Sequence, residues 1–462
     1  MKQFHVFDWS ILGLYIIGLI WVGIYKQNKK PVSQNEFILS GRKLSLGGFI
    51  ATLVTTWYGA ILGIGENTFL YGIQTWFIFS LPYYLFAMAY AFWIAPKINQ
   101  MNLVSIPDHF RNHFGNNSGI ISALLITFLA SPAPYILSMG ILLQFLFGLE
   151  LGISLIITSL LSVIYIWNGG FSAVVKTDII QFIFMFLGFF IIFGFLCFEI
   201  GTPNEMLTQL PKQYLEPFGG NTAQYVLAWF FIAAWTFIDP GFFQRCAASD
   251  SPETARKGIL ISISFWAVFD CLTIISGLYA VNLINTDQPL LAFPLLGALI
   301  LPVGFLGLFI TGLIAIIMST IDSLSLVSAI TLGRDILWRI KRTDQNSDPV
   351  PLIKKGLVII SFLSVLLAFS LPSVVKLFYT IGSILIPGLI LPFIVTLLKT
   401  RPTFNDHTAV KWILSPVIVS LLWFVKSYID GNPFLGIEPF YPGIIISIIY
   451  YLIASKKNQY GD

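Results

Sequence analysis

The sequence predicts an all-α protein that crosses a membrane many times, and three observations support this fold class. Of the 462 residues, 56% are hydrophobic and only 10% are charged, whereas globular proteins average about 25% charged residues. Apolar stretches long enough to span a bilayer, about 20 residues each, recur along almost the whole chain. Basic residues fall mainly in alternate connections between these stretches. We therefore expect the lipid bilayer as a partner and no nucleic acid, although the net charge is +4.

Thirteen spans are expected from the apolar stretches, each about 20 residues or longer. They cover residues 8–26, 46–72, 75–96, 119–147, 150–168, 177–199, 223–245, 258–283, 303–335, 354–371, 374–398, 409–427 and 438–455. A shorter apolar segment at 290–300 is expected to lie along the membrane interface. The three cysteines show no CxxC spacing and are interpreted as packing residues.

The distribution of basic residues predicts the orientation of these spans. The loop 26–45 holds five Lys and Arg residues, so the positive-inside rule assigns it to the cytoplasm. Alternation from this loop leaves only four of the 26 basic residues outside, namely Lys2, Lys212, Lys376 and Lys426. The N-terminus is therefore expected outside and the C-terminus in the cytoplasm, in a plasma or bacterial inner membrane.

Two spans contain helix-breaking residues. The second carries GAILGIG from Gly59 to Gly65, and the seventh carries Asp239-Pro240-Gly241. Irregular backbone inside a membrane is tolerated where it lines a cavity. The two spans lie five apart, so they run in opposite directions, as an inverted repeat requires. Paired broken spans are typical of secondary transporters; the alternative is that these are ordinary packing glycines.

Acidic residues in or at the ends of the spans favour a cation or proton site. Ionisable groups inside a membrane are costly and are generally functional. No Lys or Arg is expected deep in a span. The acidic set comprises Glu66, Asp178, Asp239, Asp270 and Asp322.

The most informative of these positions lies in the ninth span, within Ser319-Thr320-Ile321-Asp322-Ser323. Positions i, i+3 and i+4 share a helix face, so Ser319, Asp322 and Ser323 are expected to lie together. A cation or proton site is one interpretation. The alternative is a buried Asp bonded by neighbouring helices, with serines that pack as small residues.

Five stretches, which occur in the same order as in a known family, carry a resemblance to it. They are FILSGRKL at 37–44, GGFSAVVKTDIIQ at 169–181, QRCAASDSPETARKG at 244–258, AIIMSTIDSLSLVSAITLGRD at 315–335 and IGSILIPGLILPF at 381–393. Together they resemble the motifs of the sodium:solute symporter family, whose members include proline, galactose, pantothenate and sialic-acid transporters. GGxxAVxxTDxxQ is the most specific match.

The resemblance implies the leucine-transporter-like architecture, a core of five plus five helices in inverted repeat. The extra first span and cytoplasmic loop would occupy residues 1–45. The two repeats would occupy 46–200 and 201–400. The last two spans and a short tail would occupy 401–462. The implied function is sodium-coupled symport of a small organic solute by alternating access.

The family's principal sodium site, carried over by motif, implies five positions here. Ser319 and Thr320 would supply hydroxyls, and Leu53, Thr56 and Ile316 would supply backbone carbonyls. A second cation site seen in some members implies Asp178 and Ser323, with Asp322 added where some members have Ser. Two close carboxylates cannot both ionise without a cation between them, so this second site would hold Na⁺ or a proton.

The resemblance also implies a substrate site halfway across the membrane, between the broken spans. Its positions are Thr55, Gly59, Ala60, Ile232, Trp235, Thr236, Asp239 and Tyr379. Galactose transporters carry Asn, Glu and Gln where this chain has Thr, Gly and Ala, so a sugar cannot be inferred by transfer. Asp239 would favour a cationic or zwitterionic amine; amino acids, carboxylates, sugars and vitamin-like solutes all remain open.

Other classes are weighed against a sodium symporter. A proton-coupled or sodium-independent transporter, or a channel-like protein of the same fold, remains the alternative. An enzyme is not expected, because neither HExxH nor GxSxG occurs. We expect Na⁺ as the coupling ion, no organic cofactor and no obligate protein partner.

Overall fold

A computed structural model describes residues 4–25, 33–341, 347–370, 373–398 and 404–460. These residues are almost entirely helical, and β-structure among them amounts to an isolated bridge between Leu44 and Ser249. The chain runs through α1 (Val6–Tyr25), α2 (Gln34–Leu39), α3 (Leu46–Trp57), α4 (Ile61–Tyr71), α5 (Gln74–Phe79), α6 (Leu81–Trp93), α7 (Ala95–Gln100), α8 (Ile106–His113), α9 (Asn116–Leu129), α10 (Ala133–Phe147), α11 (Leu151–Glu199), α12 (Pro203–Gln209), α13 (Ala223–Ile232), α14 (Pro240–Ala248), α15 (Pro252–Leu283), α16 (Ala292–Ile300), α17 (Phe305–Ile330), α18 (Val350–Ser370), α19 (Val374–Leu398), α20 (Asp406–Asp430) and α21 (Phe440–Tyr460).

The two broken spans predicted from the sequence are broken in the structure. Helices α3 and α4 form one span that bends by 51° between Trp57 and Ile61. The other break separates α13 from α14, with the short η3 (Ala233–Ile238) between them. At that break the Asp239 carboxylate caps α14 by accepting a hydrogen bond of 2.8 Å from the Phe242 N–H. Pro240 follows at the first helical position, where its missing N–H costs nothing.

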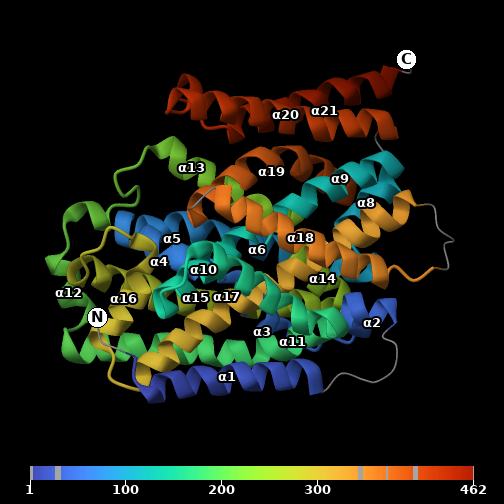
Figure 1. Cartoon of the computed structure of the whole chain (residues 1–462). Helices are drawn as coiled ribbons and strands as arrows, with labels where there is room; N and C mark the ends of the chain where they lie inside the picture. Colours follow the sequence, from blue (N-terminus) through green and yellow to red (C-terminus); the bar gives the residue numbers. More distant parts are fainter. Residues whose placement is uncertain (1–3, 26–32, 342–346, 371–372, 399–403, 461–462) are drawn as a thin grey trace.

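The first helix of the chain and the last two lie on opposite sides of the helical core. α1 packs against α11 and α17 on one side, and the antiparallel pair α20 and α21 packs against α19 on the opposite side (Figure 1). α11 contains one non-helical residue, Gly170, with φ of 53°. A side chain there would meet the Phe37 carbonyl oxygen at 2.3 Å, so only glycine fits this bend.

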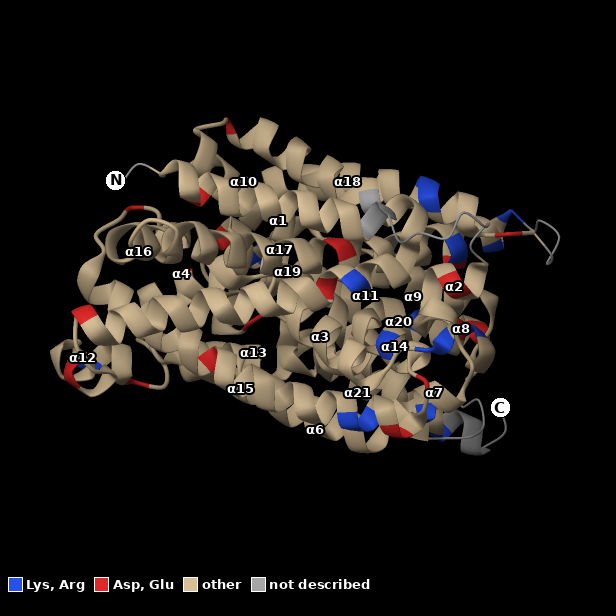
Figure 2. Cartoon of the chain, turned by 90° about the horizontal axis from the view of Figure 1, so that it is seen from below, with Lys and Arg blue, Asp and Glu red and all other residues tan. Residues whose placement is uncertain are grey.

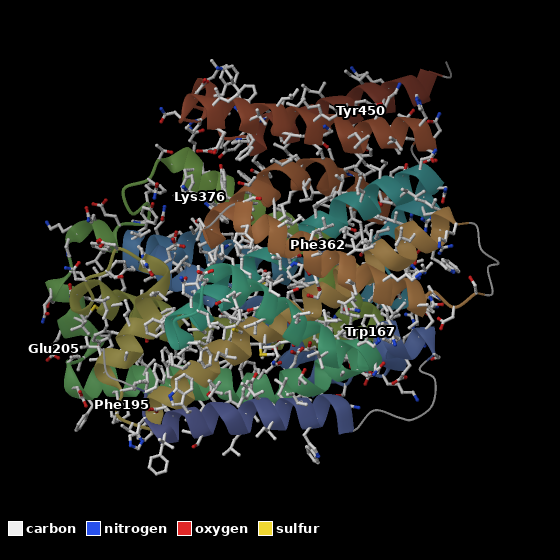
Figure 3. All side chains as sticks on the ribbon, in the orientation of Figure 1. Trp167, Phe195, Glu205, Phe362, Lys376 and Tyr450 are labelled. Carbon is white, nitrogen blue, oxygen red and sulfur yellow. The ribbon has the colours of Figure 1, made fainter. Side chains whose placement is uncertain are left out.

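The helices have the length and surface of membrane spans. Within the described residues, nine helices are long and apolar enough to cross a bilayer, or ten if the bent pair counts as one span. Three further expected spans, at 8–26, 150–168 and 438–455, coincide with shorter apolar helices. The total of thirteen therefore remains a prediction. Large apolar side chains cover the outside of the bundle, among them Phe362, which is 65% exposed (Figure 3).

Charges divide along the length of the helices. Figure 2 shows Lys and Arg gathered toward the end that carries α2 and α8. The two chain termini lie at opposite ends of the molecule (Figure 1). Both features agree with the orientation expected from the sequence, which itself stays a prediction. The segment expected as an interfacial helix at 290–300 forms α16.

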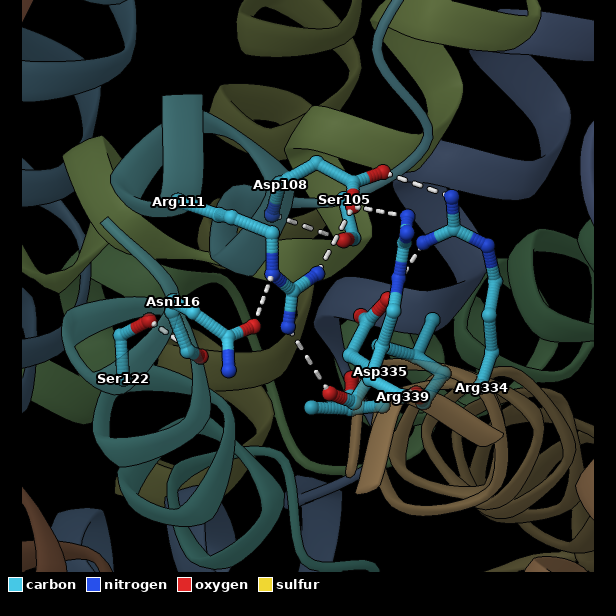
Figure 4. A network of polar contacts seen from close by, with 11 residues as sticks. Ser105, Asp108, Arg111, Asn116, Ser122, Arg334, Asp335 and Arg339 are labelled. Carbon is cyan, nitrogen blue, oxygen red and sulfur yellow. Dashed lines mark hydrogen bonds and ion pairs between the residues drawn. The ribbon is translucent and has the colours of Figure 1, made fainter. Parts of the chain in front are cut away.

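A buried ionic network fixes α17 at the basic end of the molecule (Figure 4). Beyond α17 the chain continues as a wider π-helical turn, η5 (Thr331–Trp338). Within η5, Arg334 pairs with Asp335. The Nη2 atom of Arg334 also lies 2.8 Å from Oδ2 of Asp108 on α8. Arg111 donates to the Asp335 carbonyl at 3.2 Å. Because each of these charges has an opposite partner, the network can stay buried and tie α8 to α17.

Candidate functional site

A central cavity lies where the two helix breaks meet. It has a volume of about 110 Å³ and is lined from α3, α4, α5, α6, α9, α10, α13, η3, α14, α17 and α19. Five of the eight predicted substrate positions line it, namely Ala60, Ile232, Trp235, Thr236 and Asp239. Leu53 and Thr56, predicted for sodium, border the same space.

The other three predicted substrate positions do not line this cavity. Thr55 is fully buried, and its hydroxyl donates to the Ala51 carbonyl at 2.8 Å. The backbone of Gly59 packs against the side chains of Thr320 and Tyr135. The Tyr379 hydroxyl donates to the carboxylate of Glu438, in the loop between α20 and α21.

The walls of the cavity are largely aromatic. They include Trp57, Phe79, Tyr83, Tyr135, Trp229, Trp235, Phe242 and Phe378. The indole N–H of Trp235 is buried and has no partner among the described residues. Aromatic faces attract cations as well as apolar groups. The cavity therefore suits a compact apolar body that carries a small number of polar or cationic atoms.

Two side chains of opposite charge border this cavity, Asp239 and Arg245. Both lie beside Gly241: a side-chain carbon built there would sit 2.9 Å from Asp239 Oδ1 and 3.2 Å from Arg245 Nη1. Asp239 uses Oδ1 for the α14 cap. The Arg245 side chain is wholly buried. Arg245 lies in the last turn of α14, and its complete burial there was not predicted from the sequence.

Three hydroxyl groups stabilise the buried guanidinium of Arg245. Its Nη2 donates to the hydroxyls of Thr52, Thr56 and Ser323 at 2.8, 2.7 and 3.0 Å. Thr52 in turn donates to the Asp178 carboxylate. A buried charge is tolerated when it is hydrogen-bonded and faces an opposite charge. Arg245 belongs to the QR motif. Its predicted position at the end of a span gave no indication that it would bond to hydroxyls of α3 and α17.

The oxygens predicted for the principal sodium site partly converge. The Thr320 hydroxyl lies 2.9 Å from the Thr56 carbonyl and 3.3 Å from the Ile316 carbonyl, and it donates to both. The fourth position, Leu53, lies one turn before Thr56 on α3. The fifth, Ser319, instead donates to Asp178 at 2.6 Å. Oxygen atoms of this kind are what a hard cation prefers, so the donor set fits Na⁺.

Close approach of α3 to α17 makes this convergence possible. A side-chain carbon on Gly59 would lie 2.3 Å from Thr320 Cβ and 2.5 Å from a ring carbon of Tyr135. Real Cβ atoms do not come so near. Glycine at the break therefore lets the carbonyls of α3 reach the hydroxyl of Thr320 on α17.

The residues predicted for a second cation site are bonded separately. Asp178 accepts hydrogen bonds from Ser319 and Thr52. Ser323 lies 3.0 Å from the Thr56 hydroxyl. Both carboxylate oxygens of Asp322 are buried and have no hydrogen-bond partner in the described part of the chain. The three residues belong to one region, but no bond joins Asp322 to the other two.

A second acidic centre supports the first helix break. Asp270 on α15 accepts hydrogen bonds from the hydroxyls of Tyr58, at 2.9 Å, and of Tyr84. Tyr58 also donates to the Trp266 carbonyl at 3.0 Å. Tyr58 lies in the bend between α3 and α4, so Asp270 ties that bend to α6 and α15. Sequence reasoning noted Asp270 as a buried acid but did not find this role.

Comparison with known proteins agrees with this geometry. A model described as the sodium:solute symporter family matches residues 37–409. The chain is 23% identical over 481 residues to the osmoregulated proline transporter OpuE of Bacillus subtilis strain 168, covering 97% of this chain and 94% of that protein. It is also 23% identical over 484 residues to the sodium/proline symporter of Staphylococcus aureus strain JH9, covering 97% and 92%.

Solved structures share the fold at low sequence identity. A Na⁺-coupled sialic acid symporter in a substrate-bound outward-open state matches with a TM-score of 0.79 at 18% identity, over 100% of this chain and 99% of that chain. Mhp1, a nucleobase-cation-symport-1 family transporter, matches with a TM-score of 0.58 at 14% identity, over 94% and 96%. These matches show that the chain has the all-helical, leucine-transporter-like fold expected from the sequence, whereas the bounds of the two repeats stay a prediction.

Proposed function

The chain belongs to the sodium:solute symporter family, and on that premise we propose that its solute is a compact apolar molecule that carries an amino group. Sodium-coupled symport of a small organic solute is the activity of the protein. The observation that supports an amino-group solute is the Asp239 carboxylate, which borders a cavity with largely aromatic walls. An ammonium group would pair with this carboxylate, and the aromatic faces would hold the apolar body.

Zwitterionic amino acids are the first candidates within this class. Their carboxylate could accept a hydrogen bond from the unpartnered indole N–H of Trp235. The two similar relatives named above are a proline transporter and a sodium/proline symporter, which makes L-proline a reasonable first probe. A sugar is less well served, because most of the surface that lines the cavity is apolar.

In the proposed cycle, sodium binding joins α3 to α17. Na⁺ would be held by the Thr320 hydroxyl and the carbonyls of Thr56 and Ile316, with Leu53 and Ser319 as the further expected ligands. These oxygens come from the first broken span and from α17. Because Thr56 also borders the cavity, sodium would fix the wall against which the solute binds. Release of either ligand would loosen the same helix contact.

A second coupling site at Asp178, Ser323 and Asp322 remains part of the proposal. The positively charged guanidinium of Arg245 already donates hydrogen bonds to the hydroxyls of Thr52 and Ser323, beside Asp178. A second cation there would have to displace or tolerate this guanidinium. If Asp322→Asn changes neither the sodium stoichiometry nor the pH dependence of uptake, Asp322 has no part in coupling.

The test of the solute class uses the purified protein in liposomes. Uptake of labelled L-proline is measured with an inward sodium gradient, with a proton gradient alone and with no gradient. Unlabelled amino acids, betaine, glucose and sialic acid serve as competitors. We expect sodium-driven uptake that amino acids suppress and glucose does not. Uptake driven equally well without sodium would remove sodium as the coupling ion.

The variant Asp239→Asn tests the role of the carboxylate. Asparagine also caps helices well, so the fold of α14 should survive the change. Loss of a charged partner is expected to raise the KM for an amino-group substrate by about 10- to 150-fold, since hydrogen bonds to charged groups contribute about 1.5–3 kcal/mol. An unchanged KM would show that Asp239 serves only as the cap.

A further inference from the structure

The loop between α20 and α21, residues 431–439, reaches back from the last two helices to the transport core. Gln224 of α13 donates from its side chain to the Gly436 carbonyl, and the Tyr441 hydroxyl donates to the Gln224 carbonyl at 2.8 Å. The rings of Phe231 and Phe440 stack with centroids 6.4 Å apart and an interplanar angle of 6°. The loop contacts α13 through Gly436, and the start of α21, at Phe440 and Tyr441, adds two further contacts.

Glu438 in this loop makes the contact with α19. Its side chain is only 7% exposed, and its carboxylate accepts the hydrogen bond of the Tyr379 hydroxyl. The Tyr379 ring packs against Tyr225 and Trp229 of α13, with centroids 5.7 and 5.4 Å away. Trp229 is part of the cavity wall. One bond thus fixes a tyrosine that connects α19 to the wall of the cavity.

The hydrogen bond from Tyr379 is the main interaction that offsets the cost of burying the Glu438 carboxylate. The titratable side chains that face it are the tyrosines Tyr225, Tyr379 and Tyr441. It forms no ion pair with any described residue. A carboxylate buried without a cation is costly unless it is hydrogen-bonded. The position is therefore suited to hold Tyr379 in one orientation.

We propose that Glu438 is a positioning residue, and that the loop 431–439 acts as a latch that holds α13 and α19 together at one mouth of the central cavity. The proposal rests on the transport function, because the latch matters only if α13 moves relative to α19. Opening of this mouth requires that the Glu438–Tyr379 bond break or that the whole loop move with α13. The last two helices then regulate access to the cavity without lining it.

The test measures access to the cavity without any substrate. Ile232 lines the cavity from the end of α13 and is 1% exposed, so Ile232→Cys reports the opening of this mouth. The rate of labelling by a membrane-impermeant maleimide is measured on the full protein in liposomes. The rate of the protein without Ile232→Cys is subtracted, which removes labelling of the three native cysteines.

Removal of the latch should raise this rate. We expect Glu438→Ala and Tyr379→Phe each to increase it about tenfold, the effect of losing a hydrogen bond to a charged group. The double variant should match the single variants, because both remove the same bond. Glu438→Gln keeps an acceptor and should restore a rate near that of the unmodified latch. Glu216→Ala, an exposed residue just before α13, is the matched control and should have no effect.

The outcomes separate this proposal from the proposed function. Unchanged labelling in Glu438→Ala and Tyr379→Phe, or effects that simply add in the double variant, would overturn the latch. If Glu438→Ala does not fold, Tyr379→Phe decides alone. Failure of sodium-driven L-proline uptake would count against the transport proposal only, since labelling needs neither sodium nor solute.

Discussion

The substitution Gly59→Ala tests the sodium site by its tightest contact. The added methyl group would lie 2.3 Å from both Cβ and Oγ1 of Thr320 and 2.5 Å from Tyr135. Ordinary carbon contacts lie at about 3.5–4.0 Å, so the break between α3 and α4 must move away from α17 by more than about 1 Å. Thr320 Cβ is attached directly to the backbone of α17, so rotation of a side chain cannot relieve the clash.

The size of the effect follows from this displacement. Overpacking of a well-filled interior costs about 1–3 kcal/mol, which corresponds to about a 5- to 150-fold weaker sodium affinity if the cost falls on the sodium-bound state. The Thr56 carbonyl, now 2.9 Å from Thr320 Oγ1, would leave the range in which both atoms bind one ion. We expect a folded protein that has lost most of its sodium binding.

The assay is thermal unfolding in NaCl compared with choline chloride. A ligand that binds only the folded state raises stability by RT ln(1 + [L]/Kd), so the unmodified protein should melt at a higher temperature in sodium. The shift should be small or absent in Gly59→Ala. The matched control is Gly47→Ala in the same helix α3, where the new methyl group meets nothing within 4 Å. A sodium shift in Gly59→Ala equal to that of Gly47→Ala would refute the assigned sodium site.

Two further predictions concern the helices that surround the site. Asp270→Ala should destabilise the protein by about 3 kcal/mol, because the hydroxyls of Tyr58 and Tyr84 lose their shared acceptor; Asp270→Asn, which keeps one acceptor, should cost less in urea unfolding. His109 on α8 is fully buried against Thr396, and burial lowers its pKa to about 3, with a smaller effect from His113. The folded state therefore resists protonation, and stability present above the ordinary pKa of 6.5 is lost as the pH falls below it. Between pH 7.5 and 5 we expect a loss of about 2 kcal/mol in unfolding free energy, and His109→Gln should remove that part of the pH dependence; an equal slope in both proteins would contradict it.

The sequence predicted features that depend on local spacing. Apolar length predicts the helices, and Gly59 and Pro240 mark the two breaks because glycine and proline act on their own segment. The polar face of Ser319 and Ser323 also follows from helix periodicity. These predictions need no knowledge of which helices become neighbours.

The features that the sequence did not reveal depend on contacts between distant segments. Arg245 is buried because Thr52, Thr56 and Ser323 meet it from α3 and α17. Tyr379 bonds to Glu438, which lies 59 positions later in the chain, in the loop between α20 and α21. No periodicity in either segment encodes such a pairing, so the spacing of residues cannot indicate it.

The buried guanidinium of Arg245 has a consequence for how the membrane potential acts on transport. With both carboxyls ionised, Asp178, Asp239 and Arg245 together hold a single negative charge at the centre of the protein. One Na⁺ and a zwitterionic solute would neutralise the net charge of this group of three. The membrane potential, which acts with about 2.3 kcal/mol per 100 mV on each charge that crosses the membrane, would then drive the return of the empty carrier rather than the loaded step.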